Sequence, residues 1–269
     1  MSIEFQKSNA RNDSPHPDRV LEEVGQFLRE ERSLFGDFLL TEQSTNAREY
    51  PVSTRKQTVA EELSLFQLPP APRAPLTTEA WGVAETLDGL DKQICTCVKC
   101  PLGHTRTKFV FGVGNPAATL MLIGEAPGAD EDAQGEPFVG RAGQLLNKIL
   151  EAINFKRADV YICNILKCRP PNNRTPQSDE VEQCIPYLKK QIDLIKPRVI
   201  LCLGLVAAQN LLHATEGLGK LRGRVITYEG IPLMVTYHPA ALLRNPNWKR
   251  PAWEDVQAVR KLHDELLAK

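Results

Sequence analysis

The sequence predicts an α/β protein: a three-layer α/β/α domain with a central, mostly parallel sheet, preceded by an N-terminal extension that is part helical and part disordered. Two observations lead to this fold class. Short apolar runs that end at a glycine or a polar residue recur between residues 118 and 237, as buried strands do. Segments with a helical spacing of apolar residues separate these runs, and this alternation builds a parallel sheet covered on both faces.

The expected elements of the domain begin at residue 77. A helix capped by Thr77 or Thr78 is predicted over 77–93. Strands are predicted at 118–123, 160–166, 199–203, 225–228 and 233–237, the last two as a hairpin-like pair around Gly230. Further helices are predicted at 143–155, 178–196, 204–212 and 253–267.

The N-terminal part has a different character. Residues 1–40 are predicted to be an extension with one helix, over Val20–Phe38, and residues 41–76 a Pro-rich linker, so that the folded domain is 77–269. We expect the extension to act as a tether whose helix binds a protein partner of unknown identity. The net charge of zero hides a division: residues 1–87 carry 9 basic and 14 acidic side chains, and residues 88–269 carry 24 and 19.

The composition excludes several classes of protein. With 42% hydrophobic and 25% charged residues, the chain is neither fibrous nor wholly disordered. It has no apolar run of transmembrane length and no secretory signal pattern at its start, so we expect neither membrane insertion nor secretion. Seven cysteines, an odd number in such a chain, argue against a disulfide framework. Cys163 and Cys202 lie inside apolar strands and are expected to be buried thiols.

The remaining cysteines indicate a metal site. Cys97 and Cys100 have the spacing of two thiolates that bind one metal centre, and Cys168 and Cys184 follow a predicted strand and lie in the next helix. Cys95 could replace Cys97 as a ligand. Both zinc and a [4Fe–4S] cluster accept four thiolates, so the spacing leaves the two open.

Chemically active side chains gather after the predicted strands. The first strand is followed by the segments 124–132 and 135–140, the second by Asn164 and the segment 167–174, and the last by Tyr237–Pro246. Each segment alone has an ordinary interpretation as a turn, a capped loop or a solvated acidic run. Together they supply a carboxylate, an amide, an aromatic ring and a histidine at the strand ends, where sheets of this kind bind ligands.

These segments resemble the type-4, iron–sulfur uracil-DNA glycosylases. The matching motifs, in order, are GEAPGADED (124–132), PFVGRAG (137–143), NILKCRPP (164–171), LGLVAA (203–208) and YHPAALLRNP (237–246). The resemblance covers residues 88–269. It implies an enzyme that flips uracil out of single- or double-stranded DNA and hydrolyses its N-glycosidic bond, and it implies a monomer located in the cytoplasm at a bacterial or archaeal nucleoid.

The resemblance also implies the cofactor and the residues that contact the base. Cys97, Cys100, Cys168 and Cys184 would bind a [4Fe–4S] cluster, which leaves Cys95 spare. Gly124, Glu125 and Ala126 would contact uracil.

Three side chains match the tasks of base excision. Phe138 is the only aromatic residue in the first two loops and is expected to stack on the base. Asn164 offers a donor and an acceptor, which match O4 and N3–H of uracil and mismatch cytosine. His238, when neutral, can donate to O2 as the negative charge develops on the departing base.

The sequence offers more than one candidate for the group that activates water. Classical uracil-DNA glycosylases have an aspartate in the first motif, where this sequence has Ala126. We expect Glu125 to position the water, with Glu131 or Asp132 as alternatives, or a dissociative path that needs little base assistance. Gly128 replaces the tyrosine that classical enzymes place against the C5 methyl of thymine, and Glu131 is a candidate to fill that space.

A basic segment is expected to contact DNA. Six basic side chains occur over residues 220–250 against one acid, namely Lys220, Arg222, Arg224, Arg244, Lys249 and Arg250. Leu242 and Leu243 precede Arg244 and could wedge into the base stack, or else pack a short helix on the core.

Two other classes of function remain as alternatives. One branch of the superfamily binds uracil-DNA covalently through an Arg/His-rich loop, but the segment Cys168–Pro176 has neither a histidine nor an insertion. An electron-transfer iron–sulfur protein would have no need for the base-pocket residues.

Overall fold

A computed structural model describes residues 79–268 of the chain. The predicted extension over 1–40 with its helix, the linker over 41–76 and the expected protein partner therefore lie outside the described residues and stay predictions. Within the described part, no helix is both long enough and apolar enough to cross a bilayer.

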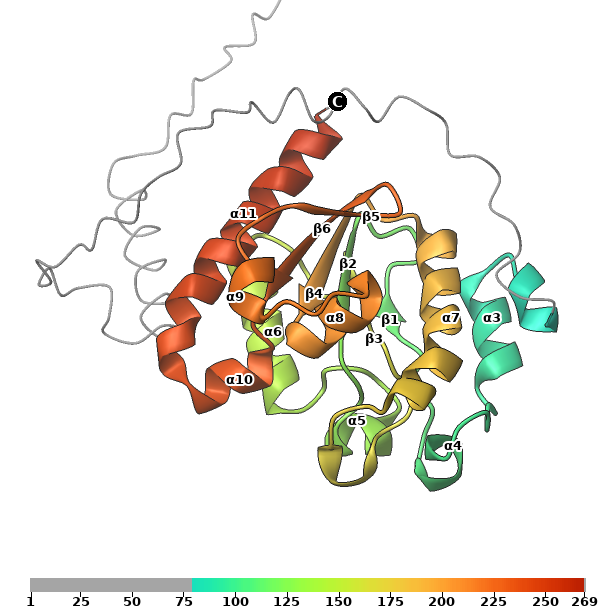
Figure 1. Ribbon diagram of the computed structural model, residues 1–269. Coiled ribbons are helices and arrows are strands. Elements are labelled where there is room, and N and C mark those ends of the chain that lie inside the picture. The colour runs from blue at the N-terminus through green and yellow to red at the C-terminus, as the bar shows by residue number, and fades with distance from the viewer. Residues whose placement is uncertain (1–78, 269) are drawn as a thin grey trace, which may run out of the picture. The chain divides into compact units, whose positions relative to one another are not determined.

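The sheet has six strands in the order β1-β3-β2-β4-β6-β5 (Figure 1). Their bounds are β1 Val113–Gly114, β2 Leu120–Gly124, β3 Tyr161–Asn164, β4 Val199–Leu203, β5 Ile226–Tyr228 and β6 Ile231–Thr236. The four central strands β3, β2, β4 and β6 are parallel, and the two edge strands are antiparallel to their neighbours. The expected mostly parallel sheet and the hairpin at its edge are confirmed. The two-residue strand β1 is too short for a periodic pattern and was not predicted from the sequence.

Helices cover both faces of the sheet, which confirms the three layers (Figure 1). Along β2, Leu120 and Leu122 pack into a core with α6 (Arg141–Ala152) and α11 (Lys249–Leu267). The alternate residues Met121 and Ile123 pack into a second core with α3, α7 and α8. Successive side chains of a strand point to opposite faces, so a fully apolar strand requires helices on both sides.

The other helices are short or lie on the second face. Their bounds are η3 Ala80–Val83, α3 Leu87–Ile94, α4 Leu102–Thr105, α5 Ala129–Gln134, η4 Pro171–Asn173, α7 Ser178–Ile195, α8 Leu205–Leu212, α9 Leu218–Leu221, α10 Pro239–Arg244 and η5 Pro246–Trp248.

Three predicted helix boundaries were wrong. The helix expected to end at residue 155 ends at Ala152. The helix expected over 77–93 is divided into η3 and α3, because Thr86 begins a new helix by accepting a hydrogen bond from the Gly89 N–H at 3.0 Å. The last helix begins at Lys249 instead of 253. Pro251 lies in its first turn, where a helix needs no backbone N–H.

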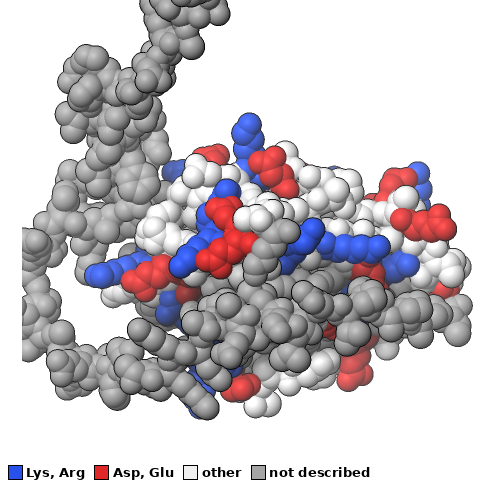
Figure 2. Space-filling view, turned by 90° about the horizontal axis from the view of Figure 1, so that it is seen from above, with Lys and Arg blue, Asp and Glu red and all other residues white. Residues whose placement is uncertain are grey.

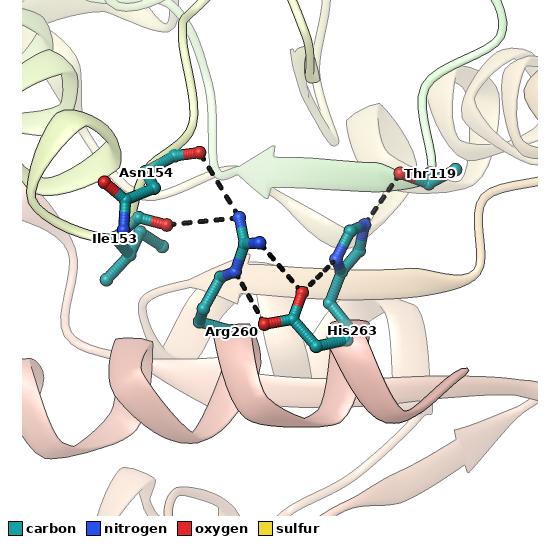
Figure 3. Close-up of polar contacts among 6 residues, drawn as sticks. Thr119, Ile153, Asn154, Arg260 and His263 are labelled. Carbon is teal, nitrogen blue, oxygen red and sulfur yellow. Dashed lines mark hydrogen bonds and ion pairs between the residues drawn. The ribbon is translucent and has the colours of Figure 1, made fainter. Parts of the chain in front are cut away.

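A polar cluster fastens the C-terminal half of α11 to the sheet layer (Figure 3). The Arg260 guanidinium donates to the carbonyl oxygens of Ile153 and Asn154, at 3.4 and 3.2 Å, and pairs with Asp264 one turn later. A 2.8 Å hydrogen bond joins His263 Nε2 to the Thr119 hydroxyl just before β2. These contacts fix α11 against both the end of α6 and the start of the central strand.

Replacing Arg260 with alanine should lower the free energy of unfolding by about 1 kcal/mol, because two carbonyl oxygens lose a charged donor at a partly exposed site. Urea denaturation followed by circular dichroism measures this change. The control is Arg250→Ala, whose exposed side chain makes one 3.6 Å contact with Glu254; it should change stability by less than about 0.5 kcal/mol. Equal effects of the two replacements would contradict the importance of the Arg260 contacts.

Candidate active site

A pocket of about 330 Å³ opens at the carboxyl ends of the central strands, beside α5 and α10 at the lower part of Figure 1. It is lined by Glu125, Ala126, Pro127, Gly128, Glu131, Phe138, Ala142, Asn164, Pro170, Asn173, Arg174, His238, Ala240 and Arg244. The pocket thus brings together seven residues singled out in the sequence for base contact, catalysis or DNA contact: Glu125, Ala126, Glu131, Phe138, Asn164, His238 and Arg244. Parallel strands end at one edge of a sheet, which is why residues so far apart in the chain meet there.

Gly124, which the resemblance places against uracil, is not in the pocket lining, but it lies directly beside two lining side chains. It is the last residue of β2, and the parallel register places it opposite Asn164, the last residue of β3. A Cβ atom at Gly124 would lie 2.3 Å from Asn164 Oδ1 and 2.7 Å from Phe138 Cζ. Both functional side chains therefore occupy the space that any other residue at this position would need.

Phe138 reaches the pocket through an uncommon backbone conformation. Its φ angle is 54°, in the left-handed region that a bulky residue rarely adopts. A Cβ atom on Gly143, in the first turn of α6, would lie 1.8 Å from the Phe138 carbonyl oxygen. The missing side chain lets the Phe138 backbone lie directly on the helix, and the ring then faces His238 at a centroid distance of 5.5 Å.

Asn164 presents an unsatisfied amide to the pocket. Its side chain is 2% exposed, and Oδ1 has no hydrogen-bond partner among the described residues. A buried polar atom without a partner costs free energy, and a ligand in the pocket can supply the missing hydrogen bond to Oδ1.

His238 is held in one tautomer at the start of α10. Its Nδ1 accepts the backbone N–H of Ala240 at 3.2 Å, which assigns the proton of the neutral ring to Nε2. Burial lowers the pKa of His238 to about 4, and the positive charge of Arg244 acts in the same direction. At neutral pH the ring is therefore an uncharged donor.

The carboxylates of the first loop have different environments. Burial raises the pKa of Glu125, whose side chain has no ion-pair partner in the described part of the chain. The Glu131 carboxylate instead accepts backbone N–H groups of Gly128, Val139 and Gly140 at 2.9–3.1 Å, so it joins the first loop to the second. Asp132 accepts the Thr107 N–H at 2.9 Å and does not line the pocket.

The sequence pattern gives no sign that several of the lining residues face the pocket. Pro170, Asn173 and Arg174 come from the loop around η4, where Asn172 and Asn173 both have a φ of 54°. Arg174 is fixed by the Glu180 carboxylate, with nitrogen–oxygen distances of 2.9 and 2.5 Å. The Pro-Pro-Asn-Asn sequence marks this segment as a turn, but nothing in it shows which side chains face the pocket.

The structure separates the two leucines proposed as a wedge. Leu242 is 2% exposed and packs in the core with α6 and α11, so of the two interpretations the core packing of a short helix holds for Leu242 and the DNA wedge does not. A short helix that lies on a core must bury one face, and Leu242 is on that face. Leu243 is 40% exposed, so its insertion into the base stack stays a prediction.

The basic segment is likewise divided. Arg222 is held by Asp255 at 2.9–3.0 Å and by the Pro251 carbonyl oxygen, so the expectation that it contacts phosphate was wrong: this guanidinium is part of the fold. Lys220, Arg224, Arg244 and Arg250 are exposed and Lys249 is half-buried. Figure 2 views the molecule from above, from the side of the β5–β6 hairpin in Figure 1, and there basic and acidic side chains of the described residues lie beside one another.

The four candidate metal-binding cysteines line one small cavity. Cys97, Cys100, Cys168 and Cys184 surround it together with the ring of Tyr187. Cys95 is not in its lining, and Cys163 and Cys202 are buried inside β3 and β4 as expected.

Three donors point at the sulfur atoms of this cavity. The Tyr187 hydroxyl donates to Cys97 Sγ at 3.2 Å and the Arg106 guanidinium to Cys168 Sγ at 3.4 Å. The Lys167 N–H donates to Cys184 Sγ at 3.3 Å. Within residues 79–268, no three His, Cys, Asp or Glu side chains converge on a position for a single metal ion.

Comparisons with known proteins agree with this geometry. The family model "Uracil DNA glycosylase superfamily" matches residues 111–257. A type-4 uracil-DNA glycosylase of Archaeoglobus fulgidus is 44% identical over 186 residues, which are 66% of this chain and 94% of the relative. One of Pyrobaculum aerophilum is 48% identical over 170 residues, 60% of this chain and 86% of the relative. A type-5 uracil-DNA glycosylase of the same organism is 32% identical over 164 residues, 54% of this chain and 71% of the relative.

The matched segments contain the pocket and reach the cysteine cavity. The family match begins before β2 and ends within α11, so it includes every strand end that contributes to the pocket. From this match and from the identity to the type-4 enzymes, the chain belongs to the uracil-DNA glycosylase superfamily and, within it, to the type-4 family.

Proposed function

We propose that this protein excises uracil from DNA in base-excision repair: it binds a flipped-out uracil in the pocket and hydrolyses the N-glycosidic bond, leaving an abasic site. The observation that carries the proposal is the unpaired Oδ1 of Asn164 in the pocket lining. An amide there can accept from N3–H of uracil with its oxygen and donate to O4 with its nitrogen, a pair of contacts that cytosine cannot make.

The pocket supports the step that precedes chemistry. A base inside a duplex must leave the stack, at a cost of a few kcal/mol that is lower for a mismatched or single-stranded uracil. The ring of Phe138 offers a stacking surface that replaces part of the lost stacking, and the missing side chain of Gly124 leaves room for this ring and for the Asn164 amide. Backbone amides of Glu125 and Ala126 provide further donors at the end of β2.

His238 is suited to stabilise the departing base. When the bond to C1′ breaks, negative charge develops on uracil and is shared by O2. The neutral ring donates from Nε2 because Nδ1 is already an acceptor. A donor that is in place before the reaction stabilises this charge without reorganisation.

Glu125 is the group that we assign to the water. Its carboxylate lines the pocket beside the end of β2, and the raised pKa caused by burial makes it a stronger base than an exposed glutamate. Glu131 is occupied by three backbone donors, which favours a role in shaping the loops, where it can also limit the space near C5 of a base.

The DNA strand is proposed to cross the pocket mouth beside α10. Arg244 lines the mouth and Leu243 is exposed one residue earlier, where it can fill the position of the extruded base. Lys220, Arg224, Lys249 and Arg250 supply the sequence-independent attraction to phosphate. A single chain contains all of these groups, so we propose that the protein acts as a monomer. Its proposed location is the nucleoid in the cytoplasm of a bacterium or archaeon, where its substrate DNA lies.

We assign a [4Fe–4S] cluster to the cysteine cavity. Each of its four irons would take one thiolate, and four cysteines line the cavity. Hydrogen-bond donors to three of the sulfur atoms match the way proteins stabilise cluster thiolates. When bound, the cluster would supply a crosslink that joins the segment 97–100 to the loop after β3 and to α7.

The assay for the proposed function separates it from the two alternatives. A labelled oligonucleotide with one uracil is incubated with the protein, treated with alkali and resolved on a denaturing gel. Strand cleavage supports excision, a denaturation-resistant adduct indicates covalent trapping, and neither result leaves an electron-transfer protein. The last two outcomes contradict the proposal.

Asn164→Asp should lower uracil excision from single-stranded DNA roughly tenfold to hundredfold, because a carboxylate cannot donate to O4 and is repelled by its lone pairs. Single-turnover rates measure this effect. The control Asn154→Asp adds the same charge at the exposed end of α6, away from the pocket, and should keep the wild-type rate. An unchanged rate in Asn164→Asp would show that this residue does not read the base.

His238→Ala should slow single-turnover excision about a hundredfold, which corresponds to the loss of ~3 kcal/mol of transition-state stabilisation. Affinity for uracil-DNA should change only a few-fold, because the bound base carries no full charge before the bond breaks. Equal losses in rate and affinity would make His238 a binding residue instead.

The pH dependence tests the state of the His238 ring. Its pKa in the folded protein is about 4, below the ordinary 6.5, so the ring stays neutral until the pH falls well below 6.5. The ratio of wild-type to His238→Ala rates should therefore be constant from pH 8 to about pH 5.5 and should change only toward pH 4. A change centred near pH 6.5 would contradict the assignment.

As purified, the protein should be brown and hold about four irons per chain, and Cys168→Ala or Cys184→Ala should lose both the colour and much of the thermal stability. Iron analysis and the visible absorption spectrum measure this. Cys95→Ala, outside the cavity, should keep the iron. A colourless protein with stoichiometric zinc is the result that would overturn the cluster.

A further inference from the structure

Lys167 is a lysine with no exposed surface: its side chain is 0% exposed. Its ammonium donates to the carbonyl oxygen of Asn164 at 2.8 Å and to Gln191 Oε1 at 2.6 Å. Both acceptors are neutral. The Asp91 carboxylate acts on the ammonium electrostatically, but no carboxylate of the described residues lies within ion-pair distance of it. Burying a charge without a directly bonded opposite charge is expensive, so a residue that only filled space here would be apolar.

The first contact holds the residue proposed to read the base. Asn164 ends β3, and the ladder to β2 fixes its backbone on one side through the Ile165 N–H and the Gly124 carbonyl, 2.9 Å apart. The carbonyl of Asn164 itself is held by the Lys167 ammonium, three residues later. A hydrogen bond from a charged donor is stronger than a neutral one, so it limits rotation of the peptide that follows Asn164.

The second contact anchors the ammonium to α7. Gln191 accepts the ammonium with Oε1, and its Nε2 donates to the Phe111 carbonyl oxygen at 3.0 Å and to the Tyr161 hydroxyl at 3.2 Å. Gln191 is itself 0% exposed. The ammonium therefore bridges the end of β3 to a fully satisfied side chain on the helix behind it.

The backbone of the same residue reaches the cysteine cavity. The Lys167 N–H donates to Cys184 Sγ at 3.3 Å, and its carbonyl oxygen accepts the Val110 N–H at 2.9 Å. One residue later the chain supplies Cys168. The five residues from Asn164 to Cys168 thus run from the base pocket to the cysteine cavity. Lys167 bonds to Asn164 with its ammonium and to Cys184 with its backbone N–H.

We propose that Lys167 is a positioning residue that couples the two sites: its ammonium fixes the peptide of Asn164 in the base pocket, and its N–H orients Cys184 in the cysteine cavity. The inference rests on the proposed function, and it adds a residue that touches neither the base nor the iron. A cation is suited to this place because thiolates of an occupied cavity are the negative charge that the buried ammonium lacks.

The test compares Lys167→Met with two other variants in the full-length protein purified with its cofactor. Methionine keeps the length of the side chain and removes both hydrogen bonds. Gln191→Met keeps the ammonium and removes one of its acceptors. Val259→Ala, in the core on the opposite face of the sheet, is the control for a general loss of stability. The measurements are kcat and KM on single-stranded uracil-DNA, iron per chain, urea midpoint, and hydrogen exchange of the segment 161–168.

We expect Lys167→Met to lower kcat about a hundredfold with KM within threefold, as a shift of about 1 Å in a positioned group does. Hydrogen exchange should become faster in 161–168, and iron should be lost faster to a chelator. Gln191→Met should change the same quantities less. Val259→Ala should lower the urea midpoint without changing kcat more than threefold or exchange in 161–168.

Other outcomes overturn the coupling. These are wild-type kcat and exchange in Lys167→Met, exchange that rises across the whole sheet, or a loss of kcat in Val259→Ala that matches its loss of stability. If Lys167→Met does not fold, Gln191→Met decides: a local rise in exchange with lowered kcat supports the inference, and wild-type behaviour overturns it. If the wild-type protein excises no uracil, the proposed function fails, while exchange and iron retention still decide the coupling.

Discussion

The active site depends on the space that is left free at Gly124. The parallel register of β2 and β3 places this residue opposite Asn164, and the ring of Phe138 comes within the same space from the next loop. Any Cβ atom would displace the amide, the ring or both, so these two side chains hold their positions in the pocket because the strand ends in glycine. Gly143 is needed for a similar reason: a side chain there would clash with the Phe138 backbone, which lies directly on α6 with a positive φ angle. The packed apolar strands and helices around these residues keep the Asn164 and Phe138 side chains against Gly124 and the Phe138 backbone against Gly143.

The electrostatics of the pocket follow from the same burial. A desolvated histidine loses its positive charge and becomes a neutral donor, and a desolvated glutamate becomes a better base. These opposite charge effects suit a reaction in which negative charge leaves with the base and water arrives at the sugar. Glu131 is close by but is already bonded to three backbone N–H groups, so its carboxylate shapes the loops that carry the other groups. The two glutamates thus differ in environment: the Glu131 carboxylate is bonded to the backbone, whereas that of Glu125 lines the pocket with a raised pKa.

Much of the fold and of the pocket could be predicted from the sequence, and the reasons are physical. Runs such as 199–203 are apolar at every position because both sheet faces are covered, and parallel strands bring their ends to one edge, so Glu125, Asn164 and His238 were expected to meet. Contacts that depend on one helical turn or on loop conformation could not be predicted. Leu242 and Leu243 look equivalent until α10 buries one of them, and Arg222 looks like a phosphate ligand until Asp255 binds it. Arg174 reaches the pocket through two left-handed asparagines that no periodic pattern encodes.

Helix α7 explains why the cysteine cavity and the base pocket belong to one mechanical unit. Cys184, Tyr187 and Gln191 are separated by three and four residues, so they lie on one face of this helix. Cys184 accepts the Lys167 N–H, Tyr187 donates to Cys97, and Gln191 accepts the Lys167 ammonium. Helix α7 therefore carries Cys184 and bonds to Cys97 of the N-terminal segment and to Lys167, the residue that bonds to Asn164. Because these contacts share one helix face, the packing of α7 at the cysteine cavity and the support of Asn164 are linked through Lys167. The cysteines, which lie apart from the pocket, can in this way influence how firmly the backbone of Asn164 is held.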